Sequence, residues 1–257
     1  TTATNNTAVG KSALGANTTG GQNVAVGDNA LAANTTAAYN TALGTSTLQL
    51  NTTGTRNVAT GAFSLTANTT GDGNVAMGYQ ALKSNTTADN NTAIGDQALE
   101  FNTTGAQNVA VGMSSMQTNT TGYNNTAVGW ESMKALTTGA LNVAVGQQAM
   151  LVATTGDKNV CVGHNTLAAL TTADNNTAIG DNAMAANTTG AGNTAMGQNS
   201  LDSNTTGDFN VGIGIDALAA NTTADNNVGV GRNVLVANTT GTQNVAVGAF
   251  ALDANTT

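Results

Sequence analysis

One 17-residue unit is repeated along the whole chain without insertion or deletion, and this regularity limits what the chain can fold into. Each unit begins at an asparagine, and the fifteen starts are Asn6, Asn23, Asn40, Asn57, Asn74, Asn91, Asn108, Asn125, Asn142, Asn159, Asn176, Asn193, Asn210, Asn227 and Asn244. A fixed period of this size indicates that each unit is one structural element stacked on its neighbours. We therefore expect one repeat array over residues 1–257, cut from a longer chain, that forms a surface rather than a pocket.

The residues of the unit favour a strand over a helix. If each unit is numbered from its asparagine, position 2 is Val or Thr, position 4 is almost always aliphatic, and position 5 is always Gly. Asn, Thr and Gly are poor helix formers, and alternation with β-branched residues is typical of a short strand. Glycine at position 5 suits a bend. The sequence predicts an all-β parallel β-solenoid with one repeat per coil and fifteen coils.

Stacking in register places equivalent residues over one another in columns. We expect positions 2 and 4 to point inward and positions 4 and 9 to fill a thin aliphatic core. Asparagine at positions 1 and 12 is expected to form amide ladders between coils. Position 12 is Leu136, Ala153 and Leu170 in three consecutive repeats, which indicates either a shielded column or an exposed apolar patch near Trp130 and Leu141.

The charged residues are confined to positions 6, 7, 10, 16 and 17, which we expect to face water because burial of an unpaired charge is costly. The net charge is −8 with only six basic residues, which disfavours binding to nucleic acid. No apolar stretch of about 20 residues is present that would span a membrane.

Position 3 stays small and uncharged throughout, although the expected orientation of positions 2 and 4 would place it on the outer surface. This pattern favours a face that packs against another copy of the chain. The alternative is that position 3 points inward and is merely cramped. The predicted assembly face comprises Ala25, Ala59, Ala76, Ala110, Ala144, Cys161, Gly212 and Gly229.

Catalysis requires residues that break the pattern and converge, and the sequence shows none, so we expect no enzyme. His164 is interpreted as a surface residue without an acidic partner in its coil. Aspartate at position 16 occurs in pairs of neighbouring coils, which could hold calcium with nearby carbonyls or be solvated acids at a turn. These residues are Asp72, Asp89, Asp157, Asp174, Asp208 and Asp225. Apart from this possible calcium, the sequence predicts no cofactor.

The Asn-Thr-Thr segment at positions 12–14 has two further interpretations besides an amide ladder. It matches the sequence for N-glycosylation, although glycans on every coil would collide. Its two threonine columns also suggest ice binding, although adjacent threonines on a strand point to opposite faces.

Two short motifs resemble known repeat families. Asn-Val-Ala-Val-Gly at residues 23–27, 108–112, 142–146 and 244–248, and Asn-Asn-Thr-Ala-Ile-Gly at residues 90–95 and 175–180, resemble the head repeats of trimeric autotransporter adhesins. The Ala-Leu-x-x-Asn-Thr-Thr-Gly pattern is similar to arrays in phage tail fibres and large bacterial surface proteins. The resemblance implies a left-handed β-roll, a homo-oligomer (trimer or filament), and a host-surface or glycan receptor.

We therefore expect a structural repeat region of an extracellular fibre or adhesin, located outside the cell or at its surface, that self-assembles through its small-residue face. A phage tail-fibre shaft is one alternative. An ice-binding or glycan-binding solenoid is another.

Overall fold

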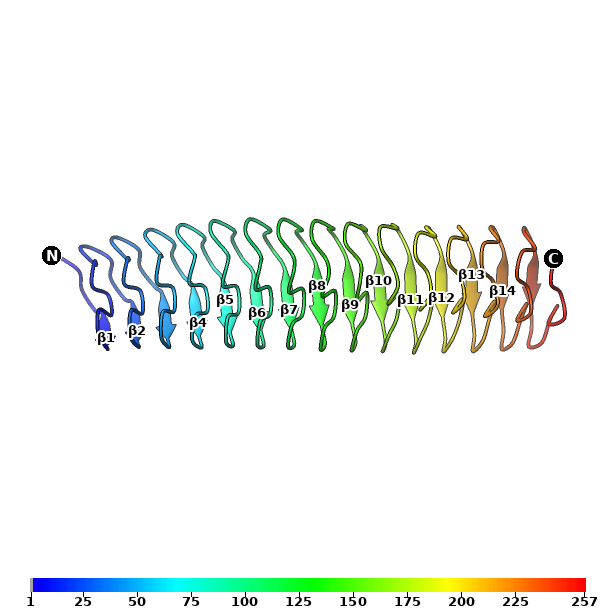
Figure 1. The fold of residues 1–257 in the computed structure, drawn as a ribbon, viewed down its shortest axis with the longest axis horizontal. Helices are drawn as coiled ribbons and strands as arrows, with labels where there is room; N and C mark the ends of the chain where they lie inside the picture. The colour runs from blue at the N-terminus through cyan, green and yellow to red at the C-terminus, as the bar shows by residue number, and fades with distance from the viewer. Residues whose placement is uncertain (1) are drawn as a thin grey trace. The chain divides into compact units, whose positions relative to one another are not determined.

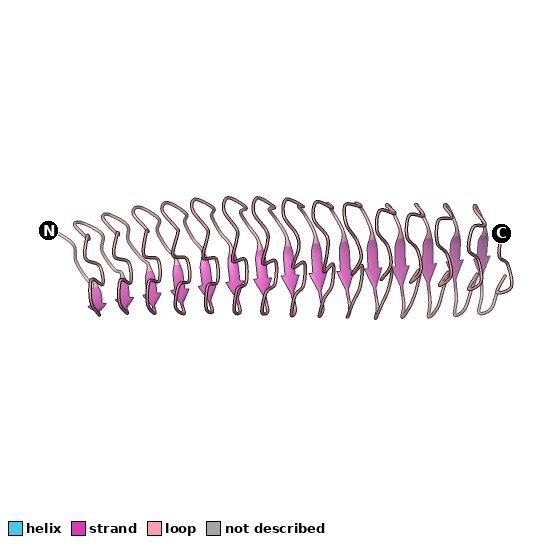
Figure 2. Cartoon of the chain, in the orientation of Figure 1, coloured by secondary structure: helices cyan, strands magenta, loops and turns pink. Residues whose placement is uncertain are grey.

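The computed structural model describes residues 2–257 and is an all-β parallel solenoid with one three-residue strand in each coil (Figure 1). Loops and turns make up the rest of every coil (Figure 2). The chain divides into two compact units, the first ending at Asn125 and the second starting at Thr126. The predicted fold class is confirmed. Within residues 2–257, the structure contains no helix with the length and apolarity needed to cross a membrane.

Each strand covers repeat positions 2–4. The strands of the first unit are β1 Thr7–Val9, β2 Val24–Val26, β3 Thr41–Leu43, β4 Val58–Thr60, β5 Val75–Met77, β6 Thr92–Ile94 and β7 Val109–Val111. Those of the second are β8 Thr126–Val128, β9 Val143–Val145, β10 Val160–Val162, β11 Thr177–Ile179, β12 Thr194–Met196, β13 Val211–Ile213, β14 Val228–Val230 and β15 Val245–Val247. In each unit the strands pair in chain order with equal repeat positions opposite one another, as expected for stacking in register.

Backbone hydrogen bonds leave each coil in both stacking directions. Val24 and Leu31 donate their N–H groups to carbonyls of the following coil, whereas Gly27 and Asn29 donate to carbonyls of the preceding coil. Every internal coil therefore donates to, and accepts from, both of its neighbours within a unit. This arrangement pairs the backbone without a long strand or a helix.

The interior is formed by repeat positions 3, 8 and 9 together with the asparagines at positions 1 and 12. In the second repeat, Ala25, Ala30 and Leu31 are fully buried, whereas Val24 is half-buried and Val26 is 37% exposed. The aliphatic column at position 9 is thus in the core as predicted. The expected inward orientation of positions 2 and 4 is wrong.

The predicted assembly face is also wrong, because position 3 lies inside the solenoid. Ala25, Ala59, Ala76, Ala110, Ala144, Cys161, Gly212 and Gly229 are all buried. The physical reason is the narrow interior. A Cβ atom on Gly229 would lie 3.0 Å from Val234 Cγ1 and 3.3 Å from Leu218 Cγ, so larger side chains do not fit there. Position 3 therefore stays small because it faces positions 8 and 9, as the alternative interpretation held.

The coil turns sharply because four positions in each repeat have positive φ angles. The glycine at position 5 is required on two grounds: Gly27 has φ 139°, and a Cβ atom there would lie 2.3 Å from the carbonyl oxygen of Gly44. Positions 7, 9 and 17 adopt the left-handed region with ordinary side chains, as in Asn29, Leu31 and Tyr39. Nothing in a buried leucine signals such a conformation, which is uncommon for non-glycine residues.

Candidate functional site

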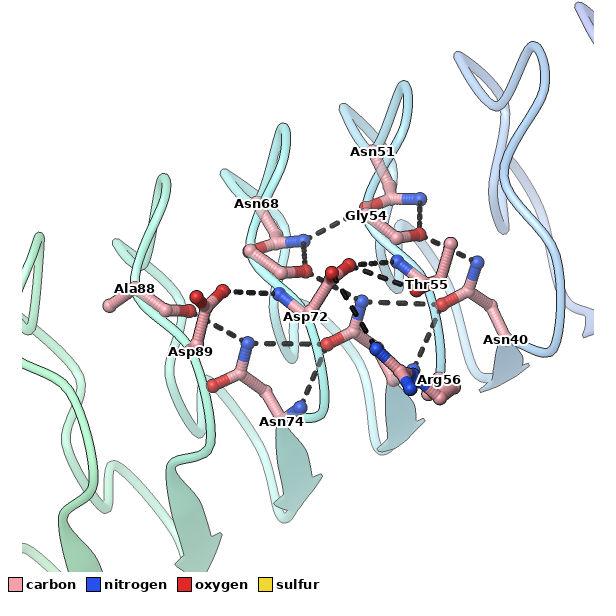
Figure 3. A network of polar contacts seen from close by, with 12 residues as sticks. Asn40, Asn51, Gly54, Thr55, Arg56, Asn68, Asp72, Asn74, Ala88 and Asp89 are labelled. Atoms are coloured by element: carbon pink, nitrogen blue, oxygen red, sulfur yellow. Dashed lines mark hydrogen bonds and ion pairs between the residues drawn. The ribbon is translucent and has the colours of Figure 1, made fainter.

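The asparagine at position 1 connects three consecutive coils through its side chain and its own backbone N–H. Asn40 Oδ1 accepts the backbone N–H of Asn57 at 2.9 Å, and its own backbone N–H donates to Asn23 Oδ1 at 2.9 Å. Its Nδ2 donates to the carbonyl oxygen of Gly54 at 2.9 Å (Figure 3). Because the side chain is fully buried and needs both an acceptor and a donor, only an amide of this length satisfies the site.

The asparagine at position 12 forms a second ladder that meets the first. Asn68 Nδ2 donates to Asn51 Oδ1 of the preceding coil at 2.8 Å, and Asn51 Nδ2 donates to the Gly54 carbonyl at 2.9 Å (Figure 3). The carbonyl at position 15 therefore accepts one amide from position 1 and one from position 12. The predicted amide ladders are confirmed in both units.

The three residues that replace asparagine at position 12 are buried. Leu136, Ala153 and Leu170 have no exposed surface, so the prediction of a shielded column is confirmed and that of an exposed patch is wrong. Asn119 is the last asparagine of this column before Leu136 in the sequence. Its Oδ1 is the one buried side-chain polar atom in residues 2–257 without a hydrogen-bond partner. The ladder thus ends at an unsatisfied acceptor.

The two threonine columns have different environments. The hydroxyl at position 13 donates to the carbonyl at position 13 of the next coil, as in Thr52 Oγ1 to Thr69 O at 3.0 Å. The threonine at position 14 is exposed in each coil, as in Thr53 and Thr70. The position-13 column is therefore mostly half-buried, whereas the position-14 column is exposed. This geometry does not support an ice-binding surface of paired threonine rows.

The aspartates at position 16 lie together in neighbouring coils and bind backbone amides. Asp72 Oδ1 accepts the N–H of Thr55 at 2.6 Å, and Asp89 Oδ1 accepts the N–H of Asp72 at 2.7 Å (Figure 3). The Nη2 atom of Arg56 lies 3.8 Å from Asp72 Oδ2. The same contact to the amide of the preceding coil is made by Asp157, Asp174, Asp208 and Asp225.

These contacts give the position-16 carboxylates a structural role that sequence reasoning missed. The hydrogen bond from a backbone N–H to a carboxylate is charge-assisted, and it offsets the repulsion between stacked acids. No group of three or more His, Cys, Asp or Glu side chains is placed to hold a metal ion in residues 2–257. The calcium site stays a prediction, with one oxygen of each carboxylate already engaged. The sequence offered one signal of this role, because all six aspartates occupy the same repeat position, 16.

One charged residue does not face water as expected. Glu100, at position 10, is 4% exposed. Its Oε2 accepts a hydrogen bond from Gln117 Nε2 at 2.9 Å, and its Oε1 lies 3.9 Å from Lys83 Nζ. Lys83 and Gln117 occupy the same position in the coils on either side. The ammonium group of Lys83 and the amide of Gln117, one from each neighbouring coil, thus compensate the buried carboxylate. An alignment of the repeats could have revealed this pairing, because the three residues share one repeat position.

His164 is on the surface, as predicted, but it does have an acidic partner. Its Nδ1 lies 2.8 Å from Asp181 Oδ1, and both side chains are about half-exposed. The partner comes from the next coil at the same repeat position. The expectation was limited to a single coil and therefore missed it. An exposed pair of this kind contributes little to stability.

The outward residues of the strands form an uncharged apolar surface, which we call the outer sheet face. It consists of repeat positions 2 and 4, where no charged residue occurs. Val26, Leu43, Met77 and Ile94 are exposed on it in the first unit. Val145, Val162 and Met196 are exposed on it in the second unit. This surface, and not the small-residue column at position 3, is the apolar face that each unit presents to its surroundings.

Cys161 is the only cysteine and is fully buried on the inner side of β10. Burial raises the pKa of its thiol far above the ordinary value, because the thiolate would be desolvated. The residue therefore behaves as a small apolar side chain in the narrow interior.

Comparison with protein-family models and with the curated proteins gives no match to this chain.

Proposed function

We propose that this chain is a structural repeat region of an extracellular fibre or surface adhesin. The observation that supports the proposal is the set of side-chain ladders at positions 1, 12 and 13. They add inter-coil hydrogen bonds to those of the backbone in nearly every coil of each unit. Separating two coils requires several of these bonds to break together. Such a unit suits a load-bearing or spacing role.

The distribution of sequence variation also supports a structural role. Variation is concentrated in exposed columns, whereas the ladder and core positions repeat almost unchanged. No pair of catalytic groups in distinct environments is apparent among the residues described above. The function is therefore assigned to the repeated interior of the solenoid rather than to one local site.

A labelling experiment tests the location. Antibodies raised against the folded chain should label the surface of intact source cells in immunogold electron micrographs. If gold appears only after lysis, the proposal is wrong. A phage tail-fibre shaft is the second candidate, favoured by the same ladders, and it predicts gold along the tails of virions and none on uninfected cells.

Limited proteolysis tests the mechanical part of the proposal on purified protein. Coils held by three ladders should resist thermolysin at exposed hydrophobic residues such as Leu50 and Phe101, which lie in turns between bonded segments. The chain unfolded in urea and diluted into protease serves as the control. Equal cleavage rates for the two samples would contradict a rigid structural role.

A further inference from the structure

We propose that the second unit opens locally at a preset place, where the amide ladder at position 12 is interrupted. In an intact part of this ladder, Asn204 Nδ2 donates to Asn187 Oδ1 of the preceding coil at 2.9 Å. Leucine and alanine side chains cannot form this bond. The residues that replace asparagine in three consecutive coils define what we call the ladder gap: Leu136, Ala153 and Leu170. Three successive coil interfaces, the last of them between Leu170 and Asn187, therefore lack the ladder bond.

The other two ladders continue through the ladder gap, so its coils stay folded. Asn159 donates its backbone N–H to Asn142 Oδ1 at 2.9 Å, and Thr154 Oγ1 donates to the Thr171 carbonyl at 3.2 Å. The gap thus weakens the contact between coils without removing it. In a repeat protein, stability is approximately a sum of coil terms and nearest-neighbour interface terms. The interfaces with the fewest bonds are therefore the first to open.

Ala153, in the middle of the ladder gap, has neither the amide nor a leucine side chain in its place. A Cβ atom on Gly139 would lie 2.7 Å from Leu136 Cδ1 of the same coil. The three heavy atoms nearest to a Cβ atom on Gly156 all come from the next coil instead, and none comes from Ala153. Alanine fills less of the column than leucine does, so apolar burial does not offset the missing hydrogen bond at this coil.

The backbone hydrogen bonds next to Ala153 are also longer than their equivalents. The N–H of Ala153 donates to the Met150 carbonyl at 3.4 Å, against 3.0 Å and 3.1 Å for the same bond in the coils before and after. The N–H of Val152 donates to the Ala168 carbonyl of the next coil at 3.3 Å, against 3.1 Å and 3.0 Å. Hydrogen bonds weaken as the donor–acceptor distance grows beyond about 3.0 Å. The weakest part of the second unit is therefore assigned to the coils around Ala153.

Cys161 can report this opening, because it is the only cysteine of the chain and is fully buried in the coil that contains Leu170. Iodoacetamide alkylates a thiol only when the reagent can reach it. The matched control carries Cys161→Ala and Ala195→Cys, which moves the thiol to the same repeat position in a coil with an intact ladder. Ala195 is also fully buried. Its coil lies closer to the C-terminus of the purified chain, where fraying would speed alkylation, so the control is a strict one.

Without denaturant, the Cys161 thiol of the wild-type chain should be alkylated at least about tenfold faster than the Ala195→Cys thiol, because fewer hydrogen bonds break when the ladder gap opens. A repaired variant carries Leu136→Asn, Ala153→Asn and Leu170→Asn. It should slow alkylation of Cys161 to the rate of the control, since the ladder bond is restored at all three interfaces. Mass spectrometry of the intact chain over time gives each rate.

Hydrogen exchange of the wild-type chain keeps the test decisive if the repaired variant fails to fold. Val152 and Thr154 donate their N–H groups to the next coil at the ladder gap, and Ser203 and Thr205 do so at the same repeat positions in the intact part. The protection factors of the first pair should be at least about tenfold lower than those of the second.

Three results would overturn the proposal. The first is alkylation of Cys161 no faster than that of the control, which would indicate that the whole unit opens at once. The second is a folded repaired variant that is alkylated as fast as the wild type, and the third is equal protection of the two pairs of N–H groups. The inference concerns the folded chain alone, so none of these results bears on the proposed location.

Discussion

Asparagine at positions 1 and 12 is equally buried, but the side-chain oxygen binds a different kind of donor at each position. At position 1, Asn91 Oδ1 accepts a backbone N–H from Asn108 at 2.9 Å. At position 12, Asn85 Oδ1 accepts only a side-chain amide, that of Asn102, at 2.9 Å. Loss of the first leaves a buried backbone group unpaired, whereas loss of the second leaves side chains unpaired. This difference explains why position 1 never varies and position 12 accepts Leu136 and Leu170.

We expect Asn91→Leu to lower the free energy of unfolding by about 2–4 kcal/mol, since the N–H of Asn108 and one amide contact of the Gly105 carbonyl are lost. The matched exchange Asn85→Leu should cost about half as much, because burial of the leucine offsets the unpaired Asn68 Oδ1. Urea unfolding followed by circular dichroism measures both. Equal costs would show that the two ladders are equivalent.

Position 17 tests the left-handed backbone. Gln22 has φ 60° and is exposed, and asparagine occupies the same position elsewhere, as in Asn90 with φ 59°. We expect Gln22→Val to cost about 1–2 kcal/mol, because a β-branched side chain is strained in this region. Gln22→Asn should leave stability within about 0.5 kcal/mol. Thermal melts compare the stability of the two variants directly. A Gln22→Val variant as stable as wild type would contradict the left-handed conformation of residue 22.

At the scale of the strand, the sequence could predict the element but not its orientation. Alternation at positions 2–4 identifies the strand, yet it does not say which side is inside. The larger residues were expected inward on hydrophobicity alone. The interior of the solenoid is too narrow to hold the larger side chains of positions 2 and 4 beside the leucine or methionine at position 9. The left-handed turns set the width of this interior. Because those turns use leucine, glutamine and tyrosine, no residue type marked them.

The turn at positions 12–14 decides where glycans can attach. Asn85 starts an Asn-Thr-Thr sequon, but its Nδ2 is buried and donates to Asn68 Oδ1 and the Ala88 carbonyl at 3.0 Å each. Asn90 starts an Asn-Asn-Thr sequon five residues later and is exposed. Access to Nδ2 is required for attachment.

Expression of the folded chain in a glycosylating host should therefore place glycans on the exposed asparagines of the four Asn-Asn-Thr sequons, but not on Asn85. These asparagines are Asn5, Asn90, Asn124 and Asn175. Peptide mapping before and after glycosidase treatment reads each site. Occupied Asn85 in folded protein would contradict the buried ladder.

The position-10 column also contains an acid whose titration couples to stability. Burial raises the pKa of Asp202 above its usual 3.8, and the nearby Asp216 adds to the shift. The folded state therefore disfavours the ionised form. This destabilisation is absent below the unfolded pKa and complete above the folded pKa, so stability falls as the pH rises through that interval.

We expect Asp202→Asn to raise the melting temperature at pH 7 and to have no effect near pH 3. Asp253→Asn, at the same repeat position but exposed, is the control and should change the melting temperature at neither pH. The pair is compared by melts at both pH values. A gain for Asp202→Asn that persists at pH 3 would point to a cause other than titration.

For the whole molecule, the strict period was sufficient to predict a parallel solenoid with one repeat per coil, because stacking in register is the simplest way to pair every backbone group of identical units. The amide ladders followed from the invariance of Asn40 and its equivalents. The aspartate contacts did not follow, since they join a side chain to the backbone of another coil and leave no matching residue in the sequence.

The same regularity makes the number of coils adjustable. Deletion of residues 74–90, one whole repeat, should preserve the circular dichroism spectrum per residue and change the melting temperature by only a few degrees. Deletion of residues 74–82 should abolish the cooperative melt, because every later column would be out of register with the columns before it. Similar behaviour of the two deletions would refute stacking by repeat.

Repeat position 14 has a consequence for use of the chain as a material. Its threonines are exposed in each coil and stand apart by the strand spacing, about 4.8 Å, within each unit. Chemical groups attached at chosen threonines of one unit would be separated by multiples of that strand spacing. Chromophores, metal chelators or sugars could thus be arranged at preset separations by choice of the repeats that carry them.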